Sequence, residues 1–193
     1  MIRRLTTHVA VASVPLMRRT TLDLIRVHRS PRDPRRGILV AGALVLPCAL
    51  GHAGLTRAKR EGDGASPVGR FRLLGGLYRP DRLPRPCSRL RLRALRRTDG
   101  WCDDPADRRY NQPVRLPDPA RHERLWRADA LYDLVLDIGW NRGPIRPGRG
   151  SAIFLHVAQP VLLPTEGCVA VPRAALRRLV ARLGPQTRIE IMP

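Results

Sequence analysis

Frequent proline and glycine constrain the fold of this chain more than any other sequence feature. The 193 residues include 19 Pro and 16 Gly, and both residue types interrupt helices and mark turns. We therefore expect many turns and short strands rather than long helices. Aliphatic side chains must fill the core, because the chain has only three Trp, three Tyr and two Phe.

Short apolar runs and alternating segments recur between turn-rich stretches. They predict strands over residues 20–28, 37–42, 43–50, 70–77, 131–138, 151–158 and 188–192. Apolar residues at helical spacing after Pro172 predict a helix over residues 172–183, and residues 120–130 are consistent with a second, short helix. Residues 59–69 are predicted to be a glycine-rich loop, and residues 79–97 an irregular segment. The predicted fold class is mainly β, in a single domain over residues 20–193.

Residues 1–19 form a separate N-terminal extension in this interpretation. A basic start precedes a short apolar run that Ser13 and Pro15 interrupt, which matches a secretory signal poorly. We expect the extension to be disordered or an artefact of the gene model, with Met17 as an alternative start. No stretch of eighteen apolar residues is present, so no membrane-spanning helix is expected. The sequence leaves the compartment open.

The formal net charge of +20 comes almost entirely from arginine, and Lys59 is the only lysine. Two interpretations stay open: codon bias in a GC-rich genome, or a polyanionic partner such as nucleic acid or an anionic cell-wall polymer. A nucleic-acid binder would cluster basic residues among exposed aromatic residues. Here arginine is spread over the whole chain and aromatic residues are few, which argues against nucleic acid.

The four cysteines contain no Cys-x-x-Cys pair and show no repeat spacing. This pattern indicates neither a zinc site nor a disulfide framework. Cys48 and His52 are four residues apart, but the neighbouring proline and glycine argue against a helix that would join them as ligands. We therefore expect no metal ion and no cofactor.

A thiol and an imidazole lie within a dozen residues of each other, at Cys168 and His156. Only a thiolate attacks, and a free thiol is ionised to a few per cent at neutral pH, so a histidine in hydrogen-bond reach activates it. Gly167 permits a tight turn that directs amide N–H groups at one point. Singly, the histidine is consistent with a core residue bonded to the backbone, and a lone cysteine is more often a small buried apolar residue. Together with the turn, they favour a cysteine acyl-transfer enzyme.

Two blocks of the sequence carry a resemblance to a known family. His156, a spacer and Thr165-Glu166-Gly167-Cys168 are similar to the His, spacer and Ser/Thr-His-Gly-Cys of the L,D-transpeptidase catalytic domain (YkuD-type). Upstream, Ser66-Pro67-Val68-Gly69-Arg70-Phe71 matches that family's Thr-Pro-x-Gly-x-Phe stretch. The two blocks occur in the expected order, and with the intervening strands the resemblance covers roughly residues 37–172.

The resemblance implies a β-sandwich-like fold and an acyl transfer on peptidoglycan stem peptides. Cys168 would attack the amide between the third residue, a diamino acid, and D-Ala. His156 would act as general base and then acid. The N–H groups of Gly167 and Cys168 would hold the oxyanion. The acyl group would pass to an amine, as in a transpeptidase, or to water, as in an L,D-carboxypeptidase or amidase. The family also implies a location in the cell envelope.

Two positions depart from the family pattern. Glu166 stands where the family has its second histidine. In an extended segment it shares a face with Cys168, and it would either orient His156, oppose thiolate formation, or form a surface pair with an arginine. Thr165 is a supporting candidate beside it. Two residues after the cysteine, where the family often has Asn or Arg, the chain has Ala170, so Arg173 is the nearest arginine for a stem carboxylate.

A polar and aromatic segment after residue 99 has neither helical nor strand periodicity. We expect it to be either a folded cap or a lip that binds substrate. Its two aspartates would receive the amine of an acceptor stem or pair with Arg108 and Arg109. The substrate-binding candidates are Trp101, Asp103, Asp104, Tyr110, Asn111, Asn141 and Arg173.

Overall fold

The computed structural model describes residues 21–193, so the predicted N-terminal extension lies outside the described residues. Within residues 21–193 the chain forms fifteen strands, one α-helix, α1 (Arg173–Val180), and one 3₁₀ turn, η1 (Pro160–Leu162). The predicted mainly β class is confirmed. The strands are β1 (Leu24–Arg29), β2 (Arg36–Ala41), β3 (Leu44–Ala49), β4 (Leu55–Thr56), β5 (Ser66–Pro67), β6 (Gly69–Arg72), β7 (Gly75–Tyr78), β8 (Leu92–Ala94), β9 (Asp99–Cys102), β10 (Pro113–Arg115), β11 (His122–Arg124), β12 (Leu134–Asp137), β13 (Phe154–Val157), β14 (Val169–Val171) and β15 (Arg188–Met192).

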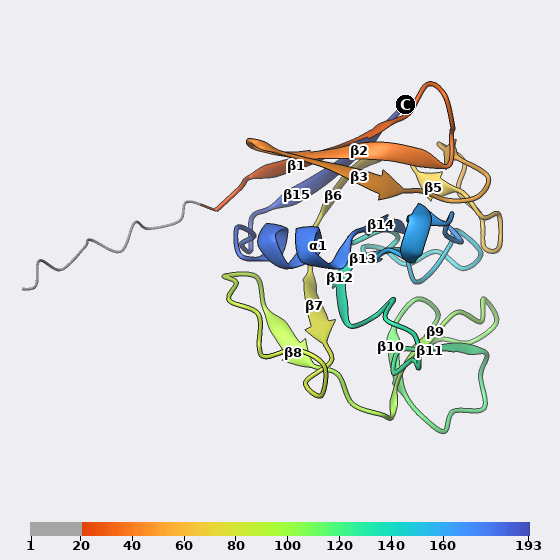
Figure 1. Ribbon diagram of the computed structural model, residues 1–193. Helices are drawn as coiled ribbons and strands as arrows, with labels where there is room; N and C mark the ends of the chain where they lie inside the picture. Colours follow the sequence, from red (N-terminus) through yellow and green to blue (C-terminus); the bar gives the residue numbers. More distant parts are fainter. Residues whose placement is uncertain (1–20) are drawn as a thin grey trace, which may run out of the picture.

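Ten of these strands form one sheet in the order β6-β15-β1-β2-β3-β14-β13-β12-β7-β8. Figure 1 shows the sheet bending, with β1, β2, β3 and β15 in an upper layer and β7 and β8 turning away below it. The meander β1–β2–β3 is antiparallel, as short connections require. Near the middle of the sheet, β13 and β14 pair in parallel, and this pair positions the segment from His156 to Cys168.

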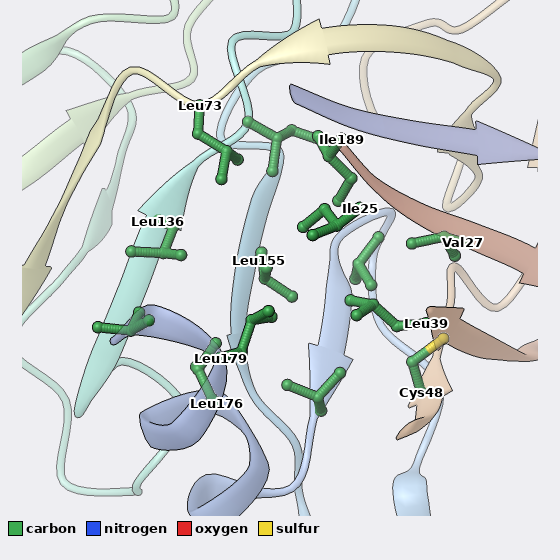
Figure 2. Packing of buried hydrophobic residues seen from close by; sticks show 14 of the residues in the cluster. Ile25, Val27, Leu39, Cys48, Leu73, Leu136, Leu155, Leu176, Leu179 and Ile189 are labelled. Atoms are coloured by element: carbon green, nitrogen blue, oxygen red, sulfur yellow. The ribbon is translucent and has the colours of Figure 1, made fainter. Parts of the chain in front are cut away.

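The helix α1 covers one side of the main hydrophobic core. It packs against β12 and β13, and its residues Leu176 and Leu179 are fully buried. Figure 2 shows both side chains directed from the helix toward Leu155 of β13. From the opposite layer, alternate residues Ile25 and Val27 of β1 enter the same core. Each such side chain contributes about 1.5–3 kcal/mol by burial, so the helix and both layers hold the β13–β14 pair in place.

A second hydrophobic cluster lies under the candidate nucleophile. It includes Trp101, Tyr132, Phe154 and Cys168, and the rings of Trp101 and Tyr132 both meet the ring of Phe154 edge to face, at 5.0 and 5.9 Å between centroids. Trp101 comes from a small sheet of order β10-β9-β11, at the lower right in Figure 1. The small sheet therefore supports one wall of the site.

The helix predicted over residues 120–130 is wrong. Residues His122–Arg124 form β11, which pairs antiparallel with β9 through His122 and Cys102. The N–H of Leu125 then donates to Asp99 O at 3.1 Å, and Leu125 is buried. Pairing with the open edge of β9 outweighs the local helical pattern.

The single strand predicted over residues 70–77 is two strands. β6 pairs with β15 and β7 pairs with β12, far apart in the order of the sheet. Between them, Leu73 N–H donates to Thr187 O and Leu74 N–H to Asp137 O, so the chain changes partners there. The segment predicted as irregular, residues 79–97, includes the short strand β8. No helix in residues 21–193 is long and apolar enough to span a membrane.

Candidate active site

Cys168 and His156 open into one cleft of about 620 Å³. Strand register explains why they meet. His156 is the parallel partner of Ala170, and side chains two residues apart on a strand share a face, so Cys168 and Ala170 face the same side as His156. The cleft is also lined by charged and polar residues from several segments, among them Lys59, Glu61, Asp103, Arg121, Glu123, Arg127, Tyr132, Ser151 and Glu166.

The thiol of Cys168 is buried between backbone groups of the neighbouring strand. Its Sγ accepts a hydrogen bond from the Phe154 N–H at 3.3 Å and donates to Ala152 O at 3.2 Å. Burial, together with the nearby carboxylate of Glu123, raises the pKa of Cys168 to about 12. The resting cysteine is therefore a neutral thiol at neutral pH.

The imidazole of His156 is held in one tautomer. Its Nδ1 lies 2.9 Å from Val157 O, and a carbonyl only accepts, so Nδ1 carries the proton and Nε2 keeps its lone pair. The ring is buried and meets the ring of Tyr132 edge to face at 5.4 Å between centroids. Burial lowers the pKa of His156 to about 4. At neutral pH the imidazole is neutral, which is the form that can accept a proton.

The turn before Cys168 has a conformation that requires glycine at position 167. Gly167 has φ +128°, and a Cβ built there would lie 2.8 Å from Ala65 O. Thr165 Oγ1 accepts from the Gly167 N–H at 3.1 Å and donates to Cys168 O at 2.7 Å. Ser66 Oγ also donates to Cys168 O, at 3.3 Å. Thr165 thus supports the turn, but it engages the Gly167 N–H that was expected to hold the oxyanion.

Glu166 does not contact His156. Its side chain is 88% exposed, and its Oε2 lies 3.2 Å from Nε2 of His52. Neither the orienting role nor the arginine pair expected for this residue is present in the structure, because the tight turn directs its side chain outward toward the loop after β3. Its charge raises the pKa of Cys168 as the last and smallest of the contributing causes.

Glu123 and Tyr132 are cleft residues that the sequence did not indicate. Tyr132 OH donates to Glu123 Oε1 at 2.6 Å, and burial raises the pKa of Glu123. Glu123 belongs to β11, so the predicted helix concealed the alternation that would have placed it on the inner face. The pair lines the cleft close to the thiol, since the Glu123 carboxylate raises the pKa of Cys168.

Three of the predicted substrate-binding residues form internal contacts instead. Trp101 Nε1 donates to Asn111 Oδ1 at 3.0 Å. Asn111 Nδ2 donates to Trp140 O and to Asn141 O, at 3.1 and 2.9 Å. Asn141 Nδ2 in turn donates to Gly150 O at 3.1 Å. These residues tie the small sheet to the loop before β13, so they support the wall of the cleft rather than line it.

The other four candidates are dispersed. Tyr110 is buried and its hydroxyl donates to Glu61. Asp104 Oδ1 accepts from the Ala106 N–H at 3.0 Å, within its own turn. Arg173, on α1, pairs with Asp133 at 3.0 Å. Asp103 alone of the seven candidates lines the cleft.

The ion pairs expected between Asp103 or Asp104 and Arg108 or Arg109 are not formed in the described residues. Asp103 pairs with Arg121 at 3.1 Å, whereas Arg109 pairs with Asp107 and Asp118. Within the described part of the chain, no group of three or more His, Cys, Asp or Glu side chains could hold a metal ion.

The fold and the cleft define a mainly β domain with a cysteine and a histidine at one buried site. The model of the L,D-transpeptidase catalytic domain (YkuD) matches residues 32–191. The chain belongs to this family, whose members act on peptidoglycan, and the predicted family is confirmed. No curated protein matches the chain.

Proposed function

We propose that this protein is a cysteine acyltransferase of the L,D-transpeptidase type that acts on peptidoglycan stem peptides. The observation that carries the proposal is the shared cleft of Cys168 and His156. A nucleophile and a base that line one cleft are the two groups that covalent catalysis brings together at one site. The Nδ1 bond to Val157 O leaves Nε2 as the only ring nitrogen able to take the thiol proton.

The reaction divides into two transfers. In the first, Nε2 of His156 takes the proton of Cys168 Sγ, and the sulfur attacks the carbonyl carbon of the third stem residue. The C–N bond to D-Ala breaks, and the departing amine receives the proton from His156. In the second, the amine of another stem attacks the thioester, loses a proton to Nε2, and releases the thiolate, which is then reprotonated.

Both groups start neutral in this scheme. A pKa of about 12 for Cys168 and about 4 for His156 disfavour a standing thiolate–imidazolium pair. Proton transfer then accompanies attack on a bound substrate, when the developing charge is solvated by the site rather than by water. Slow reaction with simple alkylating agents at neutral pH is the expected consequence.

An amine is the favoured acceptor because carboxylates line the cleft of a strongly basic protein. Its lining holds four carboxylates, Glu61, Asp103, Glu123 and Glu166, against the three cations Lys59, Arg121 and Arg127, so the cleft is slightly acidic although the chain carries a net charge of +20. A local group of carboxylates attracts an ammonium group. Water is the alternative acceptor, and it would make the enzyme an L,D-carboxypeptidase or amidase.

The test uses purified protein and defined tetrapeptide muropeptides, with product masses as the readout. Crosslinked dimers support a transpeptidase, and loss of D-Ala alone identifies a carboxypeptidase. Cys168→Ala should abolish both. The matched control is Cys87→Ala, because Cys87 is an exposed cysteine outside the cleft. Unchanged muropeptides with folded wild-type protein would refute the proposed substrate.

A further inference from the structure

Lys59 is a buried cation in a chain that otherwise uses arginine for its positive charges. It is the only lysine in the sequence, and its side chain is 2% exposed. A lysine is rarely buried unless its ammonium is paired. Here the side chain lies along the backbone of Gly150, where an added Cβ would be 3.0 Å from both Cγ and Cε. Lys59 is one of the residues that line the cleft of Cys168 and His156.

The loop after Lys59 holds its Nζ with two hydrogen bonds. Nζ donates to Arg60 O at 3.1 Å and to Asp63 Oδ1. Asp63 is itself fixed, because it accepts from the N–H groups of Arg60 and Ala65 at 2.7 and 3.0 Å. An ammonium has three N–H donors. This loop accepts from two of them, which leaves one N–H to bind a further acceptor.

Nζ also lies against the turn that carries the nucleophile. A Cβ built on Gly167 would be 3.3 Å from Nζ, so the ammonium is next to the Gly167–Cys168 backbone. The proximity has an electrostatic effect, since Lys59 acts to lower the pKa of Cys168 against the effect of burial.

The oxyanion of a tetrahedral intermediate needs donors at this place. The Gly167 N–H donates to Thr165 Oγ1 at 3.1 Å, so the Cys168 N–H remains of the expected backbone pair. One neutral N–H donor stabilises a full negative charge only weakly, and effective oxyanion sites use two or more donors. Lys59 is the nearest cation that the Gly167 turn meets.

We propose that the Lys59 ammonium is a catalytic oxyanion donor that acts with the Cys168 N–H. This inference rests on the proposed acyl transfer at Cys168. As Sγ bonds to the carbonyl carbon, the C=O electron pair moves to oxygen, and Lys59 donates its third N–H to that oxygen without transferring the proton. When the tetrahedral intermediate collapses, the C=O bond re-forms, the leaving group departs, and Lys59 returns to its resting contacts.

Two reactions of the same thiol separate this role from general support of the fold. Acetylation by p-nitrophenyl acetate passes through an oxyanion, with p-nitrophenolate as the leaving group. Alkylation by iodoacetamide displaces iodide and forms no oxyanion. Neither reagent needs recognition of a stem peptide, so a failure here is distinct from a failure of the peptidoglycan substrate. Rates are measured on the full chain after subtraction of the Cys168→Ala background.

Lys59→Met should slow acetylation roughly 100- to 1000-fold, the range for loss of one oxyanion donor. Alkylation should slow by less than about tenfold, through the loss of a nearby positive charge. The matched control is Asp63→Asn, which breaks the same ion pair but keeps the ammonium. Its ratio of acetylation to alkylation should stay within about threefold of the wild-type ratio, whatever happens to its stability.

If Lys59→Met slows both reactions equally, Lys59 has only a structural role and the inference is overturned. The same follows if Asp63→Asn changes the ratio of acetylation to alkylation as much as Lys59→Met does. An unchanged ratio in Lys59→Met would also overturn the inference. If Lys59→Met does not fold, Lys59→Gln retains a polar side chain without the charge, and the same criterion applies to its ratio.

Discussion

Replacement of Gly167 by alanine should lower catalytic activity far more than the same replacement at a glycine with positive φ outside the cleft. At φ +128° a Cβ would lie 2.8 Å from Ala65 O, 3.2 Å from Ile153 Cδ1 and 3.3 Å from Lys59 Nζ. The first distance is to backbone, so the turn itself must shift. A positive φ in a non-glycine residue costs about 1–3 kcal/mol, and the contact adds to that cost.

The consequence for activity follows from the position of the glycine. It precedes Cys168 directly, and its N–H is part of the hydrogen-bond pattern that Thr165 maintains across the turn. A displacement of about 1 Å at a reacting group lowers a rate about 100-fold. We therefore expect Gly167→Ala to fold with a loss of more than about 2 kcal/mol and to acetylate Cys168 at least 100-fold more slowly.

Gly148→Ala is the matched control for backbone strain. Gly148 also has a positive φ, +75°, but a Cβ there would meet nothing within 4 Å, and the residue does not line the cleft. It should lose about 1–2 kcal/mol in urea unfolding and keep the wild-type rate of acetylation. A folded Gly167→Ala that acetylates at the wild-type rate would refute the inferred importance of the turn.

Three further results are expected. Glu166→Gln should change the rate at which iodoacetamide alkylates Cys168 by less than about threefold, since exposed ion pairs contribute roughly 0–1 kcal/mol. Glu123→Gln should increase that rate more, because the Glu123 carboxylate has the larger effect on the Cys168 pKa. A larger increase in Glu166→Gln than in Glu123→Gln would contradict the observed site. Leu179→Ala, at a fully buried position of α1, should cost about 2–5 kcal/mol, against less than about 0.5 kcal/mol for the exposed Arg178→Ala, both by urea titration. Stability should fall between pH 6.5 and about 4, because the His156 pKa is lowered to about 4 from its ordinary 6.5, so that the unfolded chain binds the proton first. The shift limits this loss to about 3 kcal/mol, and His156→Gln should remove it; an identical pH profile in the variant would exclude His156 as its source.

Local patterns in the sequence predicted the parts of the fold that local forces control. The meander β1–β2–β3 and the helix α1 show regular alternation or helical spacing, and both are present. The break between β6 and β7 was missed because Leu73 and Leu77 were counted as one apolar pattern with Phe71, while the change of partner strand depends on distant residues. The same cause hid β11, since its partner β9 lies about twenty residues earlier.

The candidate site was predictable where chemistry and spacing occur together. Cys168 and His156 were found because two reactive residues flank a short turn, and parallel pairing of their strands brings them to one face. Lys59 and Glu123 carried no such signal. A single charged residue is normally solvated, and its burial at the cleft depends on loops that pack from other parts of the chain.

The intact mass of the protein during reaction with a tetrapeptide stem decides the role of Cys168. Acid quenching within the first turnovers should trap a covalent adduct whose mass equals the stem acyl group without D-Ala, and peptide mapping should place it on Cys168. His156→Gln should form this adduct about 100- to 10,000-fold more slowly. Turnover of the stem peptide by Cys168→Ala, or an adduct on another residue, would contradict a thioester mechanism at Cys168.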